Sequence, residues 1–275
     1  MSELVKYAIL DTDFVSKANI ICSNGCMLAD EVLRFPHYKF ACHLKMMEEL
    51  NYHNVGAGRW LQTRIETGEI ICVDDRAIIE SLKEEVGESC FLYYRSFLNE
   101  GCNIISNDFY SQYFNDLDTW IEVGNSDKDM DEFLALLQIC ESSIGHGNSY
   151  GEVKAFVLLK YLKMTQESQV IVFCSDDRGA RRGFANLSMS PCISLLAVFY
   201  KLWRMGTSYE IADGYYQSFV NWCLRRANPQ NTVRVWNYTE GTEKLIKTSI
   251  QDVLNDIYDG KYEVRKDGDL QMTRR

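Results

Sequence analysis

The segment that most constrains the fold is Val170–Arg182, with the sequence VIVFCSDDRGARR. Its first five residues are apolar and mostly β-branched or aromatic, a pattern typical of a strand buried on both faces. Asp176 and Asp177 follow this predicted strand, and a basic helix is predicted to begin after them. Because open α/β sheets bind ligands at the carboxyl ends of their strands, these acids mark a candidate site.

A second segment of the same form lies near the N-terminus. Lys6–Leu10 is predicted to be an apolar strand, and Asp11 and Asp13 follow it. Asp13 is also a good residue for capping the next helix, whereas Asp11 at the strand end has no such role. Two strands that each deliver a pair of acids predict one shared acidic cluster.

Two glutamates on predicted helices are further candidates for this cluster. His43–Leu50 has a stripe of apolar residues, and Glu48 or Glu49 flanks that face. Ser149–Glu152 matches the S-x-x-E capping box that precedes an apolar helix. Glu152 therefore either stabilises the helix N-terminus or points across the strand ends, and the sequence leaves both open.

Composition indicates a soluble globular chain. Of its 275 residues, 46% are hydrophobic and 25% are charged, which is ordinary for such proteins. No apolar run approaches the ~20 residues of a membrane span, and the N-terminus lacks the apolar core of a signal peptide. Most of the ten cysteines lie in apolar segments, which favours reduced thiols. We therefore expect a cytoplasmic protein without a membrane partner.

The pattern predicts an α/β fold: a three-layer α/β/α sandwich with a central, mostly parallel sheet. Residues 1–227 would form the main domain, with a helical insertion at about 86–130. Within the insertion we predict a strand at 103–106, a helix at 109–121 and a surface loop at 124–131.

A small α+β appendage is predicted at 228–275, after the clearest boundary in the chain at Asn228–Asn231. In the appendage we predict strands at 233–236 and 262–265 and a helix at 242–258. Elsewhere, Asp74 and Asp75 form a third acid pair, which we interpret as helix capping.

The chemistry that fits these residues best is phosphodiester hydrolysis. Several carboxylates that converge cannot all stay ionised without a cation between them. Hard oxygen ligands favour Mg²⁺ or Mn²⁺, which can activate a water and neutralise charge on a phosphate. Arg178, Arg181 and Arg182 could then hold the phosphate backbone. The net charge of −10 is a weak argument against a nucleic-acid substrate, because local patches decide phosphate contact.

The order of these motifs resembles the PIN-domain ribonucleases, in particular their toxin-like branch. Asp11 and Asp13 match the acids after the family's first strand, and Glu49-Leu50 matches its Glu before Leu. Gly151-Glu152 matches the G-E pair that opens a later helix. Ser175–Asp177 with the nearby Ala180-Arg181 matches the last acidic motif. The resemblance covers roughly the first two hundred residues with interruptions; the middle insertion and the appendage depart from it.

The resemblance implies a divalent-metal-dependent endoribonuclease that uses Mg²⁺ or Mn²⁺. The implied catalytic residues are Asp11, Glu49, Glu152, Asp176 and Asp177. The implied metal ligands are Asp11, Asp13, Glu152 and Asp177. The implied nucleic-acid contacts are Arg178, Arg181, Arg182 and Lys154. The implied substrate is RNA, either single-stranded or structured as in a tRNA, and a homodimer and an inhibitor protein are further candidate partners.

Two other hypotheses come from different classes of protein. Leu10–Val15 also fits the D-x-D-x-V opening of haloacid dehalogenase-like, Mg²⁺-dependent phosphatases, in which the first Asp is a nucleophile and the second a general acid. Asn103–Asn107 would then supply that family's strand ending in Ser. This hypothesis lacks a lysine-bearing motif and gives Glu152 no role. A non-catalytic binding protein that keeps the fold is the third hypothesis.

Overall fold

The computed structural model describes residues 6–119, 127–145, 149–165, 170–239 and 242–273. The end of the helix predicted at 109–121 and the start of the loop predicted at 124–131 lie outside these ranges. No helix in the described ranges is both long enough and apolar enough to cross a membrane. The ten cysteines all lie within the described ranges as free thiols, and seven of them are buried.

The central sheet contains, among the described residues, five strands in the order β5-β4-β1-β6-β7, and every neighbouring pair is parallel. The strands are β1 (Lys6–Leu10), β4 (Tyr38–His43), β5 (Ile70–Val73), β6 (Val170–Cys174) and β7 (Cys192–Ile193). The predicted bounds of β1 and β6 are confirmed. Leu10 pairs with Cys174, so Asp11 and Ser175 leave the sheet side by side at its carboxyl edge.

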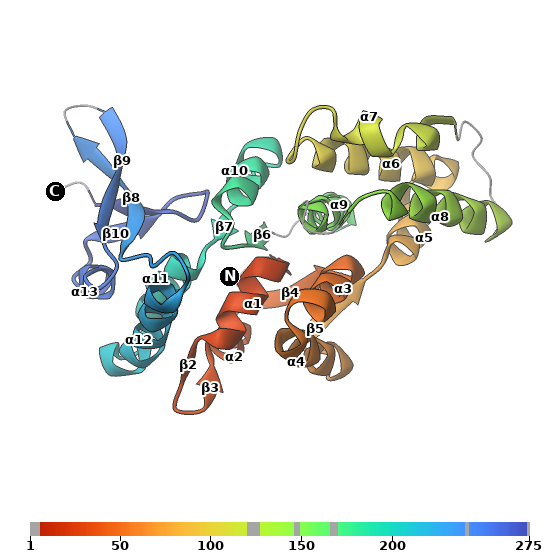
Figure 1. The fold of residues 1–275 in the computed structure, drawn as a ribbon. Helices are drawn as coiled ribbons and strands as arrows, with labels where there is room; N and C mark the ends of the chain where they lie inside the picture. Colours follow the sequence, from red (N-terminus) through yellow and green to blue (C-terminus); the bar gives the residue numbers. More distant parts are fainter. Residues whose placement is uncertain (1–5, 120–126, 146–148, 166–169, 240–241, 274–275) are drawn as a thin grey trace, which may run out of the picture.

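Helices cover both faces of this sheet (Figure 1). Ala8 and Leu10 point into one hydrophobic core, whereas Tyr7 and Ile9 point into another, as the alternation of a strand requires. The first face carries α1 (Thr12–Ile20), α2 (Leu28–Leu33), α3 (Leu44–His53), α4 (Val55–Glu66), α11 (Leu195–Arg204) and α12 (Tyr209–Arg225). The second face carries α9 (Tyr150–Thr165) and α10 (Arg178–Leu187). A two-strand hairpin, β2 (Cys22–Ser23) and β3 (Cys26–Met27), links α1 to α2.

A helical unit with its own core packs beside α9. It comprises α5 (Asp75–Val86), η1 (Gly87–Ser89), α6 (Cys90–Cys102), α7 (Phe109–Tyr113), η2 (Asn115–Thr119) and α8 (Asp127–Ser142). The strand predicted at 103–106 is wrong, because the Ile104 and Ser106 amides donate to the carbonyls of Gly101 and Cys102 in a turn that ends α6. The described part of the loop predicted at 124–131 is the first turn of α8.

The C-terminal appendage lies at the opposite end of the molecule from the helical unit (Figure 1). It contains β8 (Thr232–Thr239), β9 (Thr242–Ser249), α13 (Val253–Tyr258), β10 (Tyr262–Val264) and β11 (Leu270–Met272), with sheet order β10-β11-β8-β9. The helix predicted at 242–258 is wrong in its first half, because that segment pairs with β8 along its whole length.

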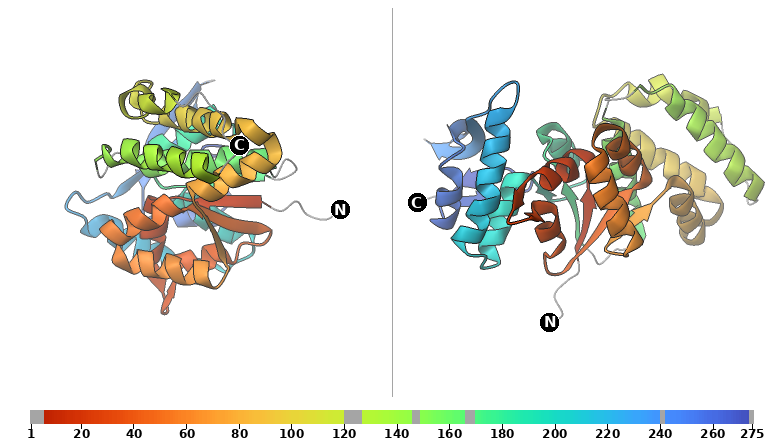
Figure 2. Two further views of the ribbon diagram at one scale, coloured as in Figure 1. Left: turned by 90° about the vertical axis from the view of Figure 1, so that its right-hand side faces the viewer. Right: turned by 60° about the horizontal axis from the view of Figure 1, so that its bottom comes forward.

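The appendage shares the core of the main domain. Val235, Val253 and Ile257 are fully buried in the same cluster as the residues of α11 and α12. Figure 2 shows α12 running alongside the appendage, with α13 close to it. This shared core fixes the β8–β9 hairpin relative to the central sheet.

Candidate active site

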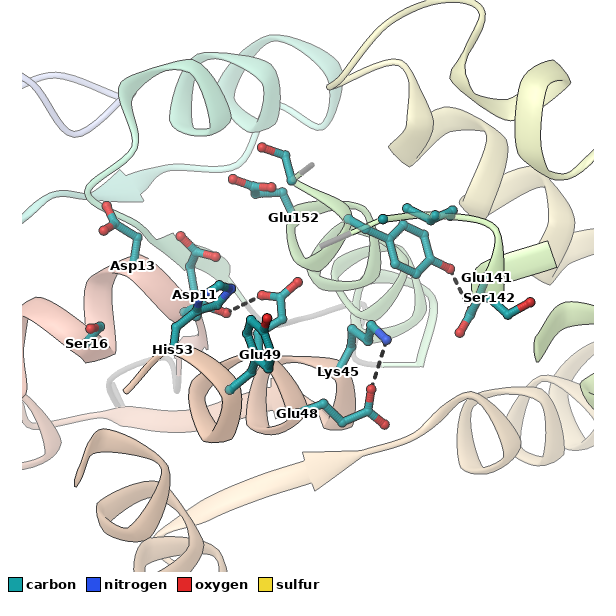
Figure 3. Close-up of a pocket in the computed structure, with 16 residues that line it drawn as sticks. Asp11, Asp13, Ser16, Lys45, Glu48, Glu49, His53, Glu141, Ser142 and Glu152 are labelled. Atoms are coloured by element: carbon teal, nitrogen blue, oxygen red, sulfur yellow. Dashed lines mark hydrogen bonds and ion pairs between the residues drawn. The ribbon is translucent and has the colours of Figure 1, made fainter. Parts of the chain in front are cut away.

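A cavity of about 700 Å³ opens at the carboxyl edge of the central sheet (Figure 3). We call it the acidic cavity, because its described lining contains six carboxylates and one lysine. The carboxylates are those of Asp11, Asp13, Glu48, Glu49, Glu141 and Glu152, and the lysine is Lys45. They come from α1, α3, α8 and α9 and from the end of β1, so segments far apart in the sequence build the cavity.

Asp11 lies at the back of the acidic cavity, directly after β1. Its side chain is buried, and one oxygen, Oδ2, accepts a hydrogen bond from Ser175 Oγ at 2.8 Å. Burial raises the pKa of Asp11 to about 7 against the effect of that bond, and the charges of Asp13 and Glu49 raise it further. Asp11 therefore exchanges its proton near neutral pH.

Glu49 is held in place by two neighbours. Its Oε2 accepts a hydrogen bond from Thr12 Oγ1 at 2.7 Å. A Cβ atom on Gly151 would overlap that same oxygen, so the missing side chain at position 151 makes room for the carboxylate. Glu48, by contrast, is exposed and pairs with Lys45 at 2.9 Å. The structure therefore brings Glu49, and not Glu48, to Asp11.

Glu152 fulfils both roles that the sequence left open. It lies in the first turn of α9, where its carboxylate accepts hydrogen bonds from Ser149 and from its own amide. Burial raises its pKa to about 8, and the charges of Asp11 and Asp177 add to that rise. In Figure 3 the carboxylates of Asp11, Glu49 and Glu152 point toward the same space. These three acids therefore line one cavity, as the prediction of a shared site requires, and their role as a metal-binding cluster stays a prediction.

Asp176 and Asp177, the two acids that follow β6, have different roles. Asp177 caps α10, because its Oδ1 accepts the Ala180 amide at 2.7 Å, and its charge still acts on Glu152. Asp176 points away from the acidic cavity, where its Oδ2 binds Lys17 Nζ at 2.8 Å. Lys17 also binds Asp13 Oδ2 at 2.6 Å. Asp176 is therefore part of an ion-paired bridge and does not line the acidic cavity.

Two of the four predicted nucleic-acid contacts are buried. Lys154 is fully buried, so a phosphate cannot reach its amine. Arg181 is only 4% exposed and donates to Asp269 at 2.8 Å and to the Ser175 carbonyl at 3.1 Å. The predictions for these two residues are wrong, because each side chain satisfies internal acceptors. Arg178 is partly exposed but pairs with Asp269, and Arg182 is exposed beside Trp236.

A polar network behind the acidic cavity was not predicted from the sequence. Lys154 Nζ lies 2.8 Å from both carboxylate oxygens of Asp75, 2.6 Å from Glu141 Oε1 and 2.9 Å from the Tyr94 hydroxyl. His43 Nε2 and the Tyr94 hydroxyl also contact Asp75. Burial alone would raise the pKa of Asp75, but Lys154 and His43 hold it well below its ordinary range. A lysine between the apolar residues Val153 and Ala155, near the start of α9, was the available signal for this network.

The sequence predicted helix capping for both Asp74 and Asp75, but the two residues have different roles in the structure. Asp74 Oδ1 accepts the Ala77 amide at 2.8 Å and caps α5, which confirms the capping prediction for that residue. Asp75 is the next residue and enters the buried network instead.

The described side chains around the acidic cavity have the donor atoms that Mg²⁺ or Mn²⁺ prefers, but these atoms are not spaced closely enough to hold an ion. The donors are carboxylate oxygens, which hard divalent ions prefer. Within the described residues, however, no three His, Cys, Asp or Glu side chains come close enough together to hold an ion. Glu49 and Glu152 each have two side-chain torsions with discrete staggered rotamers, so other rotamers would change the spacing without movement of the backbone.

Comparisons of the chain with protein-family models, with curated proteins and with solved structures find no match. Its class therefore follows from the fold and the site alone. It is an α/β protein with a parallel central sheet, and buried carboxylates of raised pKa line a cavity at the carboxyl edge of that sheet.

Proposed function

We propose that this chain is a divalent-metal-dependent endoribonuclease with a PIN-like domain, and that the acidic cavity is its active site. The observation that supports this most is the approach of Asp11, Glu49 and Glu152 from three elements with no cation paired to any of them among the described residues. Carboxylates brought together without a cation destabilise a fold, and carboxylates with perturbed pKa values cluster at functional sites.

The size and position of the acidic cavity also support an active site. A volume of about 700 Å³ lies within the range of ligand pockets and would admit a nucleotide. The carboxyl edge of a parallel sheet is where α/β proteins place their ligands.

Asp11, Glu49 and Glu152 would hold the metal, with Asp177 as the remaining ligand candidate. A bound Mg²⁺ or Mn²⁺ supplies an activated water and offsets the negative charge that develops on the phosphate. Thr12 and Gly151 position Glu49, and Ser175 orients Asp11. Because the pKa values of Asp11 and Glu152 are raised to about 7 and 8, metal binding at neutral pH would release protons from them.

A substrate panel with matched variants tests this function. Purified protein with Mn²⁺ or Mg²⁺ is offered single-stranded RNA, single-stranded DNA and a phosphomonoester, and a chelator is added in parallel. We expect cleavage of RNA that the chelator and the Asp11→Asn and Glu49→Gln substitutions abolish. Glu48→Gln is the matched control and should cleave normally. Chelator-resistant cleavage, or an active Asp11→Asn variant, would contradict the proposal.

The alternative hypotheses lose support at particular residues. The phosphatase hypothesis used Asn103–Asn107 as a strand, but 103–105 form a turn. It also needs Asp13 as a general acid, whereas Asp13 is bound to Lys17. Released phosphate in the panel would restore that hypothesis, and inertness toward every substrate would favour a non-catalytic binding protein.

A further inference from the structure

A second concave surface lies between the main domain and the appendage. It has a volume of about 460 Å³ and is walled by α1, α10 and α12 on one side and by β8 and β9 on the other. Its described lining contains six cations and two carboxylates: Lys17, Arg178, Arg181, Arg226, Arg234 and Lys247, with Asp176 and Asp269. We call it the basic groove.

Three cations of the basic groove have no acidic partner among the described residues. Arg178 is held by Asp269, and Lys17 by Asp13 and Asp176. Arg226, Arg234 and Lys247 are exposed, and in the part of the chain that the structure describes no carboxylate pairs with them. In a chain with a net charge of −10, three uncompensated cations on one surface indicate an anionic ligand.

The sheet register also brings like charges together at this surface. Arg234 on β8 and Lys247 on β9 are direct cross-strand partners. Like charges placed directly opposite each other destabilise a sheet, and the alternation of the strands turns both side chains toward the groove. Lys244, three residues before Lys247, lies on the other face of β9 and does not line the groove. The like-charge pair is therefore confined to the face that a ligand would touch.

The groove also offers an aromatic surface. The half-buried Trp222 lines it, packed on the buried Phe219, and the Arg226 guanidinium lies 4.9 Å from the centre of the Trp222 ring. Aromatic rings interleaved with cations are the means by which proteins bind single-stranded nucleic acid, since bases stack while phosphates pair. A site that binds only free phosphate would not require an aromatic side chain.

One residue joins the basic groove to the acidic cavity. Lys17 lines the groove, and its amine binds Asp13, which lines the acidic cavity. The two sites therefore adjoin across a single ion-paired bridge, and α1 forms part of both. A nucleic-acid strand in the groove would pass directly beside the carboxylates.

We propose that the basic groove binds single-stranded RNA next to the bond that is cleaved, with Arg234 and Lys247 of the appendage contacting its phosphates and Trp222 stacking on a base. This inference rests on the proposed nuclease function. It also gives the appendage a role in the reaction, because the β8–β9 hairpin supplies the second wall of a substrate channel.

A titration that measures binding apart from cleavage tests the groove. The full chain carrying Asp11→Asn is titrated against a fluorescent oligoribonucleotide, and anisotropy is followed at several salt concentrations. Adding Arg234→Gln and Lys247→Gln should weaken binding about tenfold and lower the salt slope by roughly 1.4, since each single-strand phosphate contact contributes about 0.7. Lys244→Gln is the matched control and should bind as the parent does. The double variant should melt no lower than the parent, because it loses a repulsive pair.

The outcomes separate this inference from the proposed function. Groove variants that bind RNA weakly, in a chain that never cleaves RNA, would support the groove and refute the nuclease. Cleavage of RNA with unchanged binding and KM in the groove variants would refute the groove alone. Absence of RNA binding by the parent, equal weakening by Lys244→Gln, or full displacement of RNA by millimolar inorganic phosphate would also refute it.

Discussion

Asp11 and Asp75 are two aspartates that follow parallel strands of one sheet, yet their surroundings differ completely. Asp75 lies against Lys154 and His43, which hold its pKa low. Burial, together with the smaller effect of the Asp13 and Glu49 charges, raises the pKa of Asp11 to about 7. The chain can therefore neutralise a buried carboxylate where the fold needs one. Among the described residues Asp11 has no such partner, and this difference marks the acidic cavity as the functional site.

The largest expected effect comes from removing the cation that neutralises Asp75. Lys154→Met should lower the free energy of unfolding by about 3–5 kcal/mol, because it leaves the mostly buried carboxylates of Asp75 and Glu141 without their cation. Urea denaturation measures the change. Lys160→Met on the same helix is the control and should cost about 0–1 kcal/mol, since Lys160 pairs with Glu100 in solvent. Equal losses in the two variants would contradict the structural role of the network.

The second effect comes from removing the carboxylate of Asp11, which has no cation beside it among the described residues, and here the protein becomes more stable. Asp11→Asn should raise the free energy of unfolding by about 4 kcal/mol at pH 8, because the folded state no longer holds a carboxylate whose pKa is raised. Ionisation of Asp11 costs stability progressively as pH rises from about 4, its unfolded pKa, through about 7. The gain should therefore shrink toward pH 4. Urea denaturation at pH 4, 6 and 8 checks the sign, and a gain that grows on acidification would contradict it.

The third prediction tests the position of the Glu49 carboxylate in the acidic cavity and involves a smaller change in stability. Gly151→Ala places a methyl group against the Glu49 carboxylate and must move it. We expect stability to change by less than about 1 kcal/mol, because alanine favours a helix. RNA cleavage should fall by roughly 100-fold, since a displacement of about 1 Å can cost that much. Steady-state kinetics with a folded, normally melting variant is the measurement, and unimpaired cleavage would remove Glu49 from the site.

The smallest effect tests whether position or mere acidity matters. Glu48→Gln removes an exposed carboxylate that pairs with Lys45, so stability should change by less than about 0.5 kcal/mol. Cleavage should be unchanged, whereas Glu49→Gln should abolish it. Similar activities in these two neighbours would mean that the cavity acts only through its overall charge.

Local sequence patterns predicted the strands that end at the acids and missed a strand beside them. β1 and β6 are apolar on both faces, so their bounds were predicted to the residue. β4 was missed because the apolar stretch that forms it runs directly into α3 without a turn residue. The strand β9 was mistaken for a helix, because its pairing with β8 outweighs its local pattern.

Local patterns were sufficient to place acids at strand ends, because apolar strands and parallel pairing bring their carboxyl ends to one edge. Asp11 was placed on that basis, whereas Glu49 and Glu152 were placed from helix patterns and the family resemblance, and all three line the acidic cavity. Only the tertiary structure shows which charges are neutralised. Lys154 and Arg181 turn inward to carboxylates, while Arg234 and Lys247 face each other across two strands. Charge compensation depends on contacts between residues distant in the chain, and no local pattern encodes those contacts.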